Sequence, residues 1–140
     1  ESFVSYKPEM MVTLGTLLIS FKEGALWTHD NTTYNSFYGT SYESHISPVF
    51  SKPGLQKKGW QSVIQVADDT WDCPSIYTNA NTFAGTRQET NLVSAEFTLY
   101  EGNPTASIKR DSNSRGGKIN GSFMKGQYVV VKLRKQIFSR

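Results

Sequence analysis

The sequence has one cysteine, two histidines and no stretch with the apolar spacing of an amphipathic helix. A lone cysteine, Cys73, excludes an internal disulfide and therefore the small secreted domains that disulfides hold together. With no histidine near it in sequence, we expect its thiol to be unreactive. His29 and His45 lack a neighbouring cysteine or carboxylate pattern, so no metal site and no cofactor are predicted. The most apolar stretch, residues 10–21, is too short to cross a bilayer, and we expect no membrane anchor.

Charge is also low, at a formal net value of +3. A nucleic-acid-binding face normally carries a dense basic stripe. Here the basic residues gather only around 52–58 and in 132–140, where they fit the solvent-exposed side of a strand. The sequence therefore predicts no nucleic-acid partner.

No catalytic constellation is visible either. Asp68, Asp69 and Asp72 could hold a hard cation, but their spacing does not match an EF-hand loop, and a solvated turn is favoured. There is no Gly-x-Ser-x-Gly nucleophile motif, although residue order alone leaves a Ser-His-Asp triad open. We predict a protein that is not an enzyme, with a hydrolase fragment using these aspartates as an alternative.

What the sequence does contain is a succession of short runs rich in β-branched and aromatic residues, separated by Gly, Pro, Asn, Asp and Ser. This spacing is typical of β-sandwiches and barrels. We predict a single all-β domain over residues 1–140, an antiparallel two-sheet β-sandwich, jelly-roll-like, with seven to eight strands. A chain of this length can bury a sufficient hydrophobic core without disulfides or bound metals to stabilise it. The expected strands lie at residues 10–14, 16–22, 25–29, 44–51, 59–67, 92–100, 106–110 and 126–134.

Three local details follow from these runs. The turn Lys22-Glu23-Gly24 predicts a β-hairpin, because glycine readily supplies a positive φ angle. Pro48 restricts the run 44–51 to a sheet edge, because proline cannot donate a hydrogen bond to a neighbouring strand. Alternation in 59–67 predicts that Trp60 faces the core together with Ile64 and Val66.

Two stretches lack such alternation. Residues 68–89 are expected to be irregular. Residues 30–43 form a polar loop that still carries four aromatic side chains, which indicates an ordered loop packed by its own rings or against a partner.

Aromatic side chains are the best candidates for ligand binding. Trp71 lies in a polar stretch and could offer a flat apolar face on which a sugar ring stacks. A carbohydrate-binding site would use Trp71 with Tyr34, Tyr38 and Tyr42 of the aromatic loop. The competing interpretation is that these rings cover the core beneath loops.

Several segments have a distinctive amino-acid sequence. In the C-terminal half they include residues 101–102, 116–117 and 120–121. The longer ones are Ser5-Tyr6-Lys7-Pro8-Glu9-Met10-Met11-Val12-Thr13-Leu14-Gly15, Phe21-Lys22-Glu23-Gly24-Ala25-Leu26-Trp27-Thr28-His29, Tyr34-Asn35-Ser36-Phe37-Tyr38-Gly39, Arg110-Asp111-Ser112-Asn113-Ser114 and Lys125-Gly126-Gln127-Tyr128-Val129-Val130-Val131-Lys132-Leu133. Together they resemble a module in large virion proteins of crAss-like tailed phages of gut bacteria, of the tail-stabilisation or nozzle and muzzle type. The resemblance covers most of the chain and is weakest over residues 52–90.

This resemblance implies a non-enzymatic structural domain of a phage tail or virion protein, which mediates assembly or contact with the host surface. It implies a fragment of a longer protein that is made in the reducing cytoplasm of the host bacterium and incorporated into the virion. The expected partners are other virion subunits, with a homo-oligomer in the full-length protein, and a host-surface glycan. The alternative function is a carbohydrate-binding module.

Overall fold

The computed structural model describes residues 7–29, 32, 35–51, 54, 56–81, 85–113 and 121–135. These residues are all-β with several antiparallel sheets, as predicted, and contain no α-helix. They group into two compact units, one ending at Ser44 and the other formed by His45–Lys135. The single domain over residues 1–140 and the two-sheet sandwich of seven to eight strands stay predictions.

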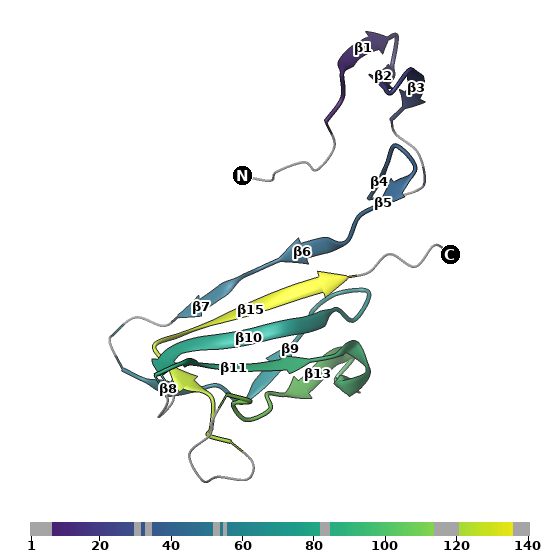
Figure 1. Cartoon of the computed structure of the whole chain (residues 1–140). Coiled ribbons are helices and arrows are strands. Elements are labelled where there is room, and N and C mark those ends of the chain that lie inside the picture. The colour runs from purple at the N-terminus through teal and green to yellow at the C-terminus, as the bar shows by residue number, and fades with distance from the viewer. Residues whose placement is uncertain are drawn as a thin grey trace. The chain divides into compact units, whose positions relative to one another are not determined.

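The first unit contains a three-stranded antiparallel sheet in the order β1-β2-β3 and a small hairpin, β4-β5 (Figure 1). Glu23 and Gly24 connect β2 to β3 with φ angles of 53° and 74°. Two consecutive positive φ angles are what a tight hairpin turn requires, so the predicted hairpin is confirmed. The strands are β1 (Met10–Leu14), β2 (Leu17–Lys22), β3 (Ala25–Thr28), β4 (Ser36–Phe37) and β5 (Thr40–Ser41).

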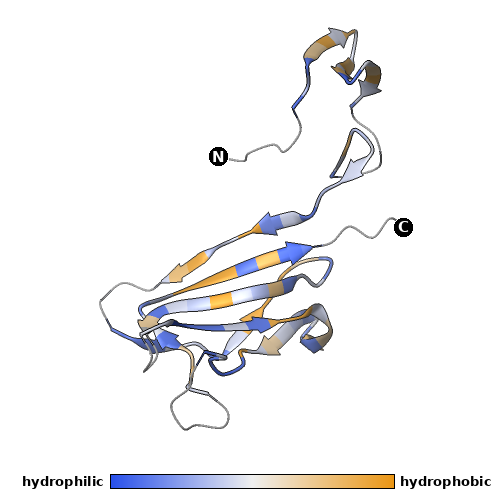
Figure 2. Cartoon of the chain, in the orientation of Figure 1, coloured by the Kyte–Doolittle hydropathy of each residue, from blue (hydrophilic) through white to orange (hydrophobic). Residues whose placement is uncertain are grey.

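The second unit is built around a five-stranded sheet in the order β11-β10-β15-β6, with β7 also paired to β15. The predicted C-terminal strand is confirmed as β15, which carries much of the apolar sequence of this sheet (Figure 2). Pro48 separates β6 from β7, and both lie at the sheet edge, as predicted. The strands are β6 (Ser44–Ile46), β7 (Val49–Ser51), β10 (Asp72–Asn81), β11 (Arg87–Leu92) and β15 (Tyr128–Lys135).

Two smaller antiparallel sheets complete the second unit: β12-β13-β9 and β14-β8. A short 3-10 helix, η1 (Ser94–Glu96), lies between β11 and β12. The strands are β8 (Lys58–Gly59), β9 (Ser62–Ile64), β12 (Thr98–Tyr100), β13 (Asn103–Ser107) and β14 (Lys125–Gly126).

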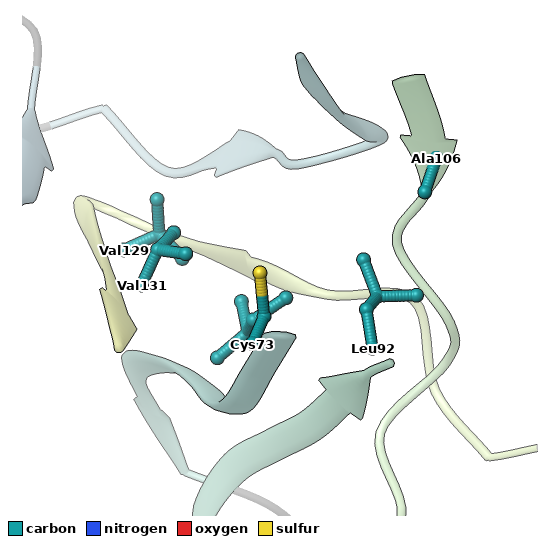
Figure 3. Close-up of a cluster of buried hydrophobic side chains, with 6 residues drawn as sticks. Cys73, Leu92, Ala106, Val129 and Val131 are labelled. Carbon is teal, nitrogen blue, oxygen red and sulfur yellow. The ribbon is translucent and has the colours of Figure 1, made fainter. Parts of the chain in front are cut away.

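The hydrophobic core of the second unit collects side chains from the five-stranded sheet and from β13 (Figure 3). Val131 lies opposite Ile76 in the register of β15 and β10, so the two side chains share one face of the sheet. Val63 of β9 and Leu133 of β15 pack against this cluster. The buried members are Cys73, Ile76, Leu92, Ala106, Val129 and Val131.

The expectation of an irregular chain over residues 68–89 is wrong, because this stretch contains β10 and the start of β11. The strand pairing shifts register between Cys73 and Ile76, so both side chains face the core although they are three positions apart. A bulge of this kind breaks the alternation that identifies a strand. Thr78 of β10 is also fully buried, but as a polar residue it does not indicate a core position in the sequence.

The expected strand at 92–100 is also wrong in part, because η1 interrupts it. The Ser94 backbone N–H donates to Asp72 Oδ1 (2.6 Å), and the Val93 N–H donates to Glu96 Oε2 (3.0 Å). These side-chain acceptors satisfy backbone groups that a continuous strand would pair with a neighbour.

The prediction that Ile64 and Val66 face the core is also wrong. Val63 packs on the core, whereas Ile64 and Val66 are 59% and 87% exposed. Trp60 packs against the core as predicted. The backbone N–H of Trp60 donates to Met124 O, whereas the backbone carbonyl of the next residue, Gln61, accepts the N–H of Ile108. The chain therefore changes its pairing partner between β8 and β9. That change of partner interrupts the strand alternation.

Asp111, which follows β13 in the chain, has a buried carboxylate that binds two chain segments. Asp111 is 3% exposed, and its Oδ1 accepts the N–H groups of Glu89 (3.0 Å) and Asn113 (2.9 Å). Its own N–H donates to Ser122 O (2.9 Å). A Cβ at Gly121 would lie 2.1 Å from the Asp111 carbonyl oxygen, so only glycine fits there.

Candidate functional site

An apolar groove of about 490 Å³ lies in the second unit, lined by residues of β6, β7, β9, β15 and the segment after β9. This volume is in the range of binding pockets for small molecules or for a few protein side chains. His45 and Gln65 are its polar lining residues. Its apolar lining includes Ile46, Phe50, Ile64, Val66, Trp71 and Leu133.

The groove is open because three of the strands around it, β6, β7 and β9, lie at sheet edges. Ile46 of β6 and Phe50 of β7 flank the Pro48 break and are 54% and 52% exposed. Ile64 and Val66 are exposed because the change of partner before β9 turns them away from the core. Contiguous exposed apolar side chains of this kind mark surfaces that bind another molecule.

Trp71 lies in this groove and is half-buried. Its backbone N–H donates to Gln65 Oε1 (2.8 Å), and Gln65 Nε2 donates to the Trp71 carbonyl oxygen (2.9 Å). Gln65 is itself buried. Because both ends of its amide are engaged with the Trp71 backbone, Gln65 positions the tryptophan segment.

The loop tyrosines belong to the first unit. Tyr38 meets the Trp27 ring edge-on at 5.5 Å, and its hydroxyl lies 2.9 Å from Ser20 Oγ. Tyr42 packs against Phe37 at 6.0 Å. These rings are therefore ordered, as predicted, but the prediction of a loop is wrong for residues 36–41, which form the β4-β5 hairpin.

The predicted carbohydrate-binding set is therefore not one site within either unit. Tyr38 and Tyr42 are in the first unit and Trp71 in the second. Tyr34 lies outside the described residues. The sequence analysis identified Trp71 but missed Ile46, Phe50 and the other apolar residues of the groove. The sequence feature that could have pointed to Ile46 and Phe50 was their position on an edge strand next to Pro48.

A serine and a histidine do meet in the first unit, where Ser20 Oγ lies 2.6 Å from His29 Nε2. Both side chains project from the same face of the β2-β3 hairpin, as period-two alternation requires. Ser20 is completely buried, so its hydroxyl cannot reach a substrate. A nucleophile needs access as well as a base, and this contact is suited to holding the aromatic cluster together.

Two of the three aspartates, Asp69 and Asp72, have structural partners. Asp72 accepts the Ser94 N–H and lies near Arg134 (3.9 Å), and Asp69 pairs with Lys135. Over the part of the chain that the structure describes, no group of three His, Cys, Asp or Glu side chains is placed to hold a metal ion.

Cys73 is completely buried in the core. Burial, reinforced by the nearby Asp72 carboxylate, raises the pKa of its thiol to about 11. The thiolate is the reactive form of cysteine. The environment therefore agrees with the expected unreactive thiol.

Comparison with protein-family models gave no match, and comparison with curated protein sequences gave no significant match. Within the described ranges, no helix has the length and apolar character needed to cross a membrane.

Proposed function

We propose that this chain is a non-enzymatic structural domain of a tailed-phage virion protein, which mediates assembly with other virion subunits or contact with the host surface. The observation that carries the proposal is the exposed apolar groove of the second unit. The sequence resemblance to virion proteins of crAss-like phages adds the phage setting. The proposed protein is longer than this chain, is made in the host bacterial cytoplasm and forms a homo-oligomer in the virion.

The composition of the groove favours a protein partner. Its lining is almost entirely apolar, and the amide of Gln65 is already engaged with the Trp71 backbone. Protein interfaces have apolar, aromatic-rich centres with few charged groups. A substrate site, by contrast, needs polar groups placed to orient and activate the reacting atoms.

We also propose that the second unit is a jelly-roll-like sandwich in which β12-β13-β9 covers the five-stranded sheet. Ala106 of β13, Val63 of β9 and Phe97 near β12 all contact the core cluster on that sheet. In such a sandwich, residues of both sheets interdigitate in a shared core.

The test is immunogold electron microscopy of crAss-like phage particles with antibodies raised against this chain. Gold at the tail or its tip is the expected result, and its position would separate assembly from host contact. Antibody pre-adsorbed on the purified chain is the control. Particles that stay unlabelled, with an antibody that binds the purified chain, would overturn the proposal for an exposed domain.

A carbohydrate-binding module is the second candidate, because Trp71 lies in an accessible groove. It predicts that Trp71→Ala abolishes glycan binding on an array, whereas Tyr100→Ala, which alters an exposed aromatic residue of β12, leaves it intact. Equal binding by the wild type and Trp71→Ala would remove this candidate.

A further inference from the structure

The strand β9 ends its sheet, and its outer backbone edge has no partner among the residues that the structure describes. In the order β12-β13-β9, its paired neighbour is β13. The Gln65 N–H donates to Pro104 O, and Gln61 O accepts from Ile108, so the backbone groups of these odd-numbered residues point toward β13. Neighbouring residues of an antiparallel strand point their backbone groups in opposite directions. The N–H and C=O groups of Ser62, Ile64 and Val66 consequently point away from the sheet.

This edge carries neither a charge nor a proline, two of the features that usually protect a strand from pairing with another chain. Residues 61–67 contain no charged residue and no proline. Natural sheets use charges, proline or bulges at such positions. The edge strand β11, by comparison, carries Arg87 and Glu89. The exposed side chains of Ile64 and Val66 add apolar surface at this edge and line the groove.

We infer that β9 pairs with β9 of a second copy of this chain, antiparallel and around a two-fold axis. This inference rests on the assembly role proposed above and names the partner of the groove region. With Ile64 opposite its counterpart, Ser62 lies opposite Val66 of the other copy, and the outward backbone groups of all three residues find partners. A two-fold interface requires such a self-complementary surface.

The charge pattern favours a second copy at this strand. Because the strand is uncharged, antiparallel pairing with itself brings no like charges together. The other edge of the same sheet, β12, lies between the Glu96–Lys109 ion pair and Glu101, so self-pairing there would bring charged groups close to the new strand pair. Pairing through β9 joins the three-stranded sheets of two copies into one and gives Ile64 a cross-strand apolar partner.

The first experiment is sedimentation equilibrium of the 140-residue chain and two matched variants. Ile64→Lys places like charges opposite each other at the proposed two-fold axis, whereas Leu99→Lys alters a residue on β12 that is 77% exposed. The wild type and Leu99→Lys should form dimers, and Ile64→Lys should weaken dimerisation by roughly tenfold or more. A monomeric wild type, or equal dimerisation of the two variants, would overturn the inference.

A cysteine variant tests the register and does not depend on introducing a charge. Directly opposite residues of this type have Cα atoms about 5.5 Å apart, within the range that a disulfide spans. Ile64→Cys should therefore form a disulfide-linked dimer under mild oxidation, and Leu99→Cys should not. Cross-linking of both variants at the same rate would contradict the register. Circular dichroism establishes that each variant folds, and Val66→Lys replaces Ile64→Lys if the latter does not.

The outcomes also separate this inference from the proposed function. A monomeric chain together with gold-labelled particles overturns the β9 pairing alone. Unlabelled particles overturn the virion role whatever the oligomeric state of the chain.

Discussion

Gly126 of β14 packs so closely against β10 that the substitution Gly126→Ala should destabilise the second unit. An added Cβ would lie 2.9 Å from Thr78 Cβ and 2.7 Å from Asn79 Oδ1. The Asn79 amide can rotate away, but its Oδ1 accepts the Gln127 N–H (2.8 Å). Thr78 Cβ cannot rotate away, because it is fixed to the backbone of β10, which lies between β11 and β15. Alanine therefore forces β14 away from β10.

The magnitude follows from two contributions. Forcing one methyl group into a close-packed site costs about 1–3 kcal/mol. Moving β14 also lengthens the bond from Thr78 Oγ1 to Lys125 O (3.0 Å), and a bond of this kind contributes about 1 kcal/mol. We expect the free energy of unfolding to fall by about 2–4 kcal/mol.

The assay is urea denaturation followed by circular dichroism, with Gly59→Ala as the matched control. Gly59 lies opposite Lys125 in the same two-stranded sheet, and its added Cβ would meet the Phe123 ring at an ordinary 3.8 Å. Gly59→Ala should be neutral or stabilise the chain by up to about 1 kcal/mol. If the two variants unfold at the same urea concentration, the close contact of Gly126 is not a determinant of stability and the reasoning fails.

Two further predictions concern titratable groups. Cys73 should remain unmodified by a thiol reagent at about pH 8 in the folded chain and react once urea unfolds it, because burial raises its pKa to about 11; rapid reaction without denaturant would contradict this burial. For Glu89, burial raises the pKa, but hydrogen bonds from Ser75 and Arg87 outweigh it and leave the pKa below its ordinary value. A lowered folded-state pKa means that Glu89 stabilises the chain above the unfolded-state pKa and that this contribution is lost as the pH falls through the folded-state pKa. Glu89→Gln should therefore reduce the loss of stability as the pH falls below the ordinary pKa of glutamate, measured by urea midpoints; an unchanged pH dependence would count against it.

The parts of the fold that follow from local chemistry were predictable. The hairpin at Glu23-Gly24, the edge position imposed by Pro48 and the apolar strand at 126–134 each rest on a few neighbouring residues. The strand β10 could not be found this way, because a bulge shifts its alternation and Thr78 fills a core position with a polar side chain. That threonine is satisfied by the carbonyl of Lys125, which is distant in sequence.

The candidate site was predictable only in part. Trp71 stood out as an aromatic residue in a polar stretch, and it does line the groove. The exposure of Ile64 and Val66 depends on the chain changing partner at Trp60, which is a property of tertiary pairing. A prediction from alternation alone therefore placed both side chains in the core.

Asp111 has a consequence for engineering the chain. Its hydrogen bonds to Glu89, Asn113 and Ser122, together with the close fit of Gly121 against its carbonyl oxygen, make this one residue common to three segments of the second unit. A substitution at Asp111 would therefore disturb all three segments at once. Variants that test β9 or the groove should leave this residue unchanged.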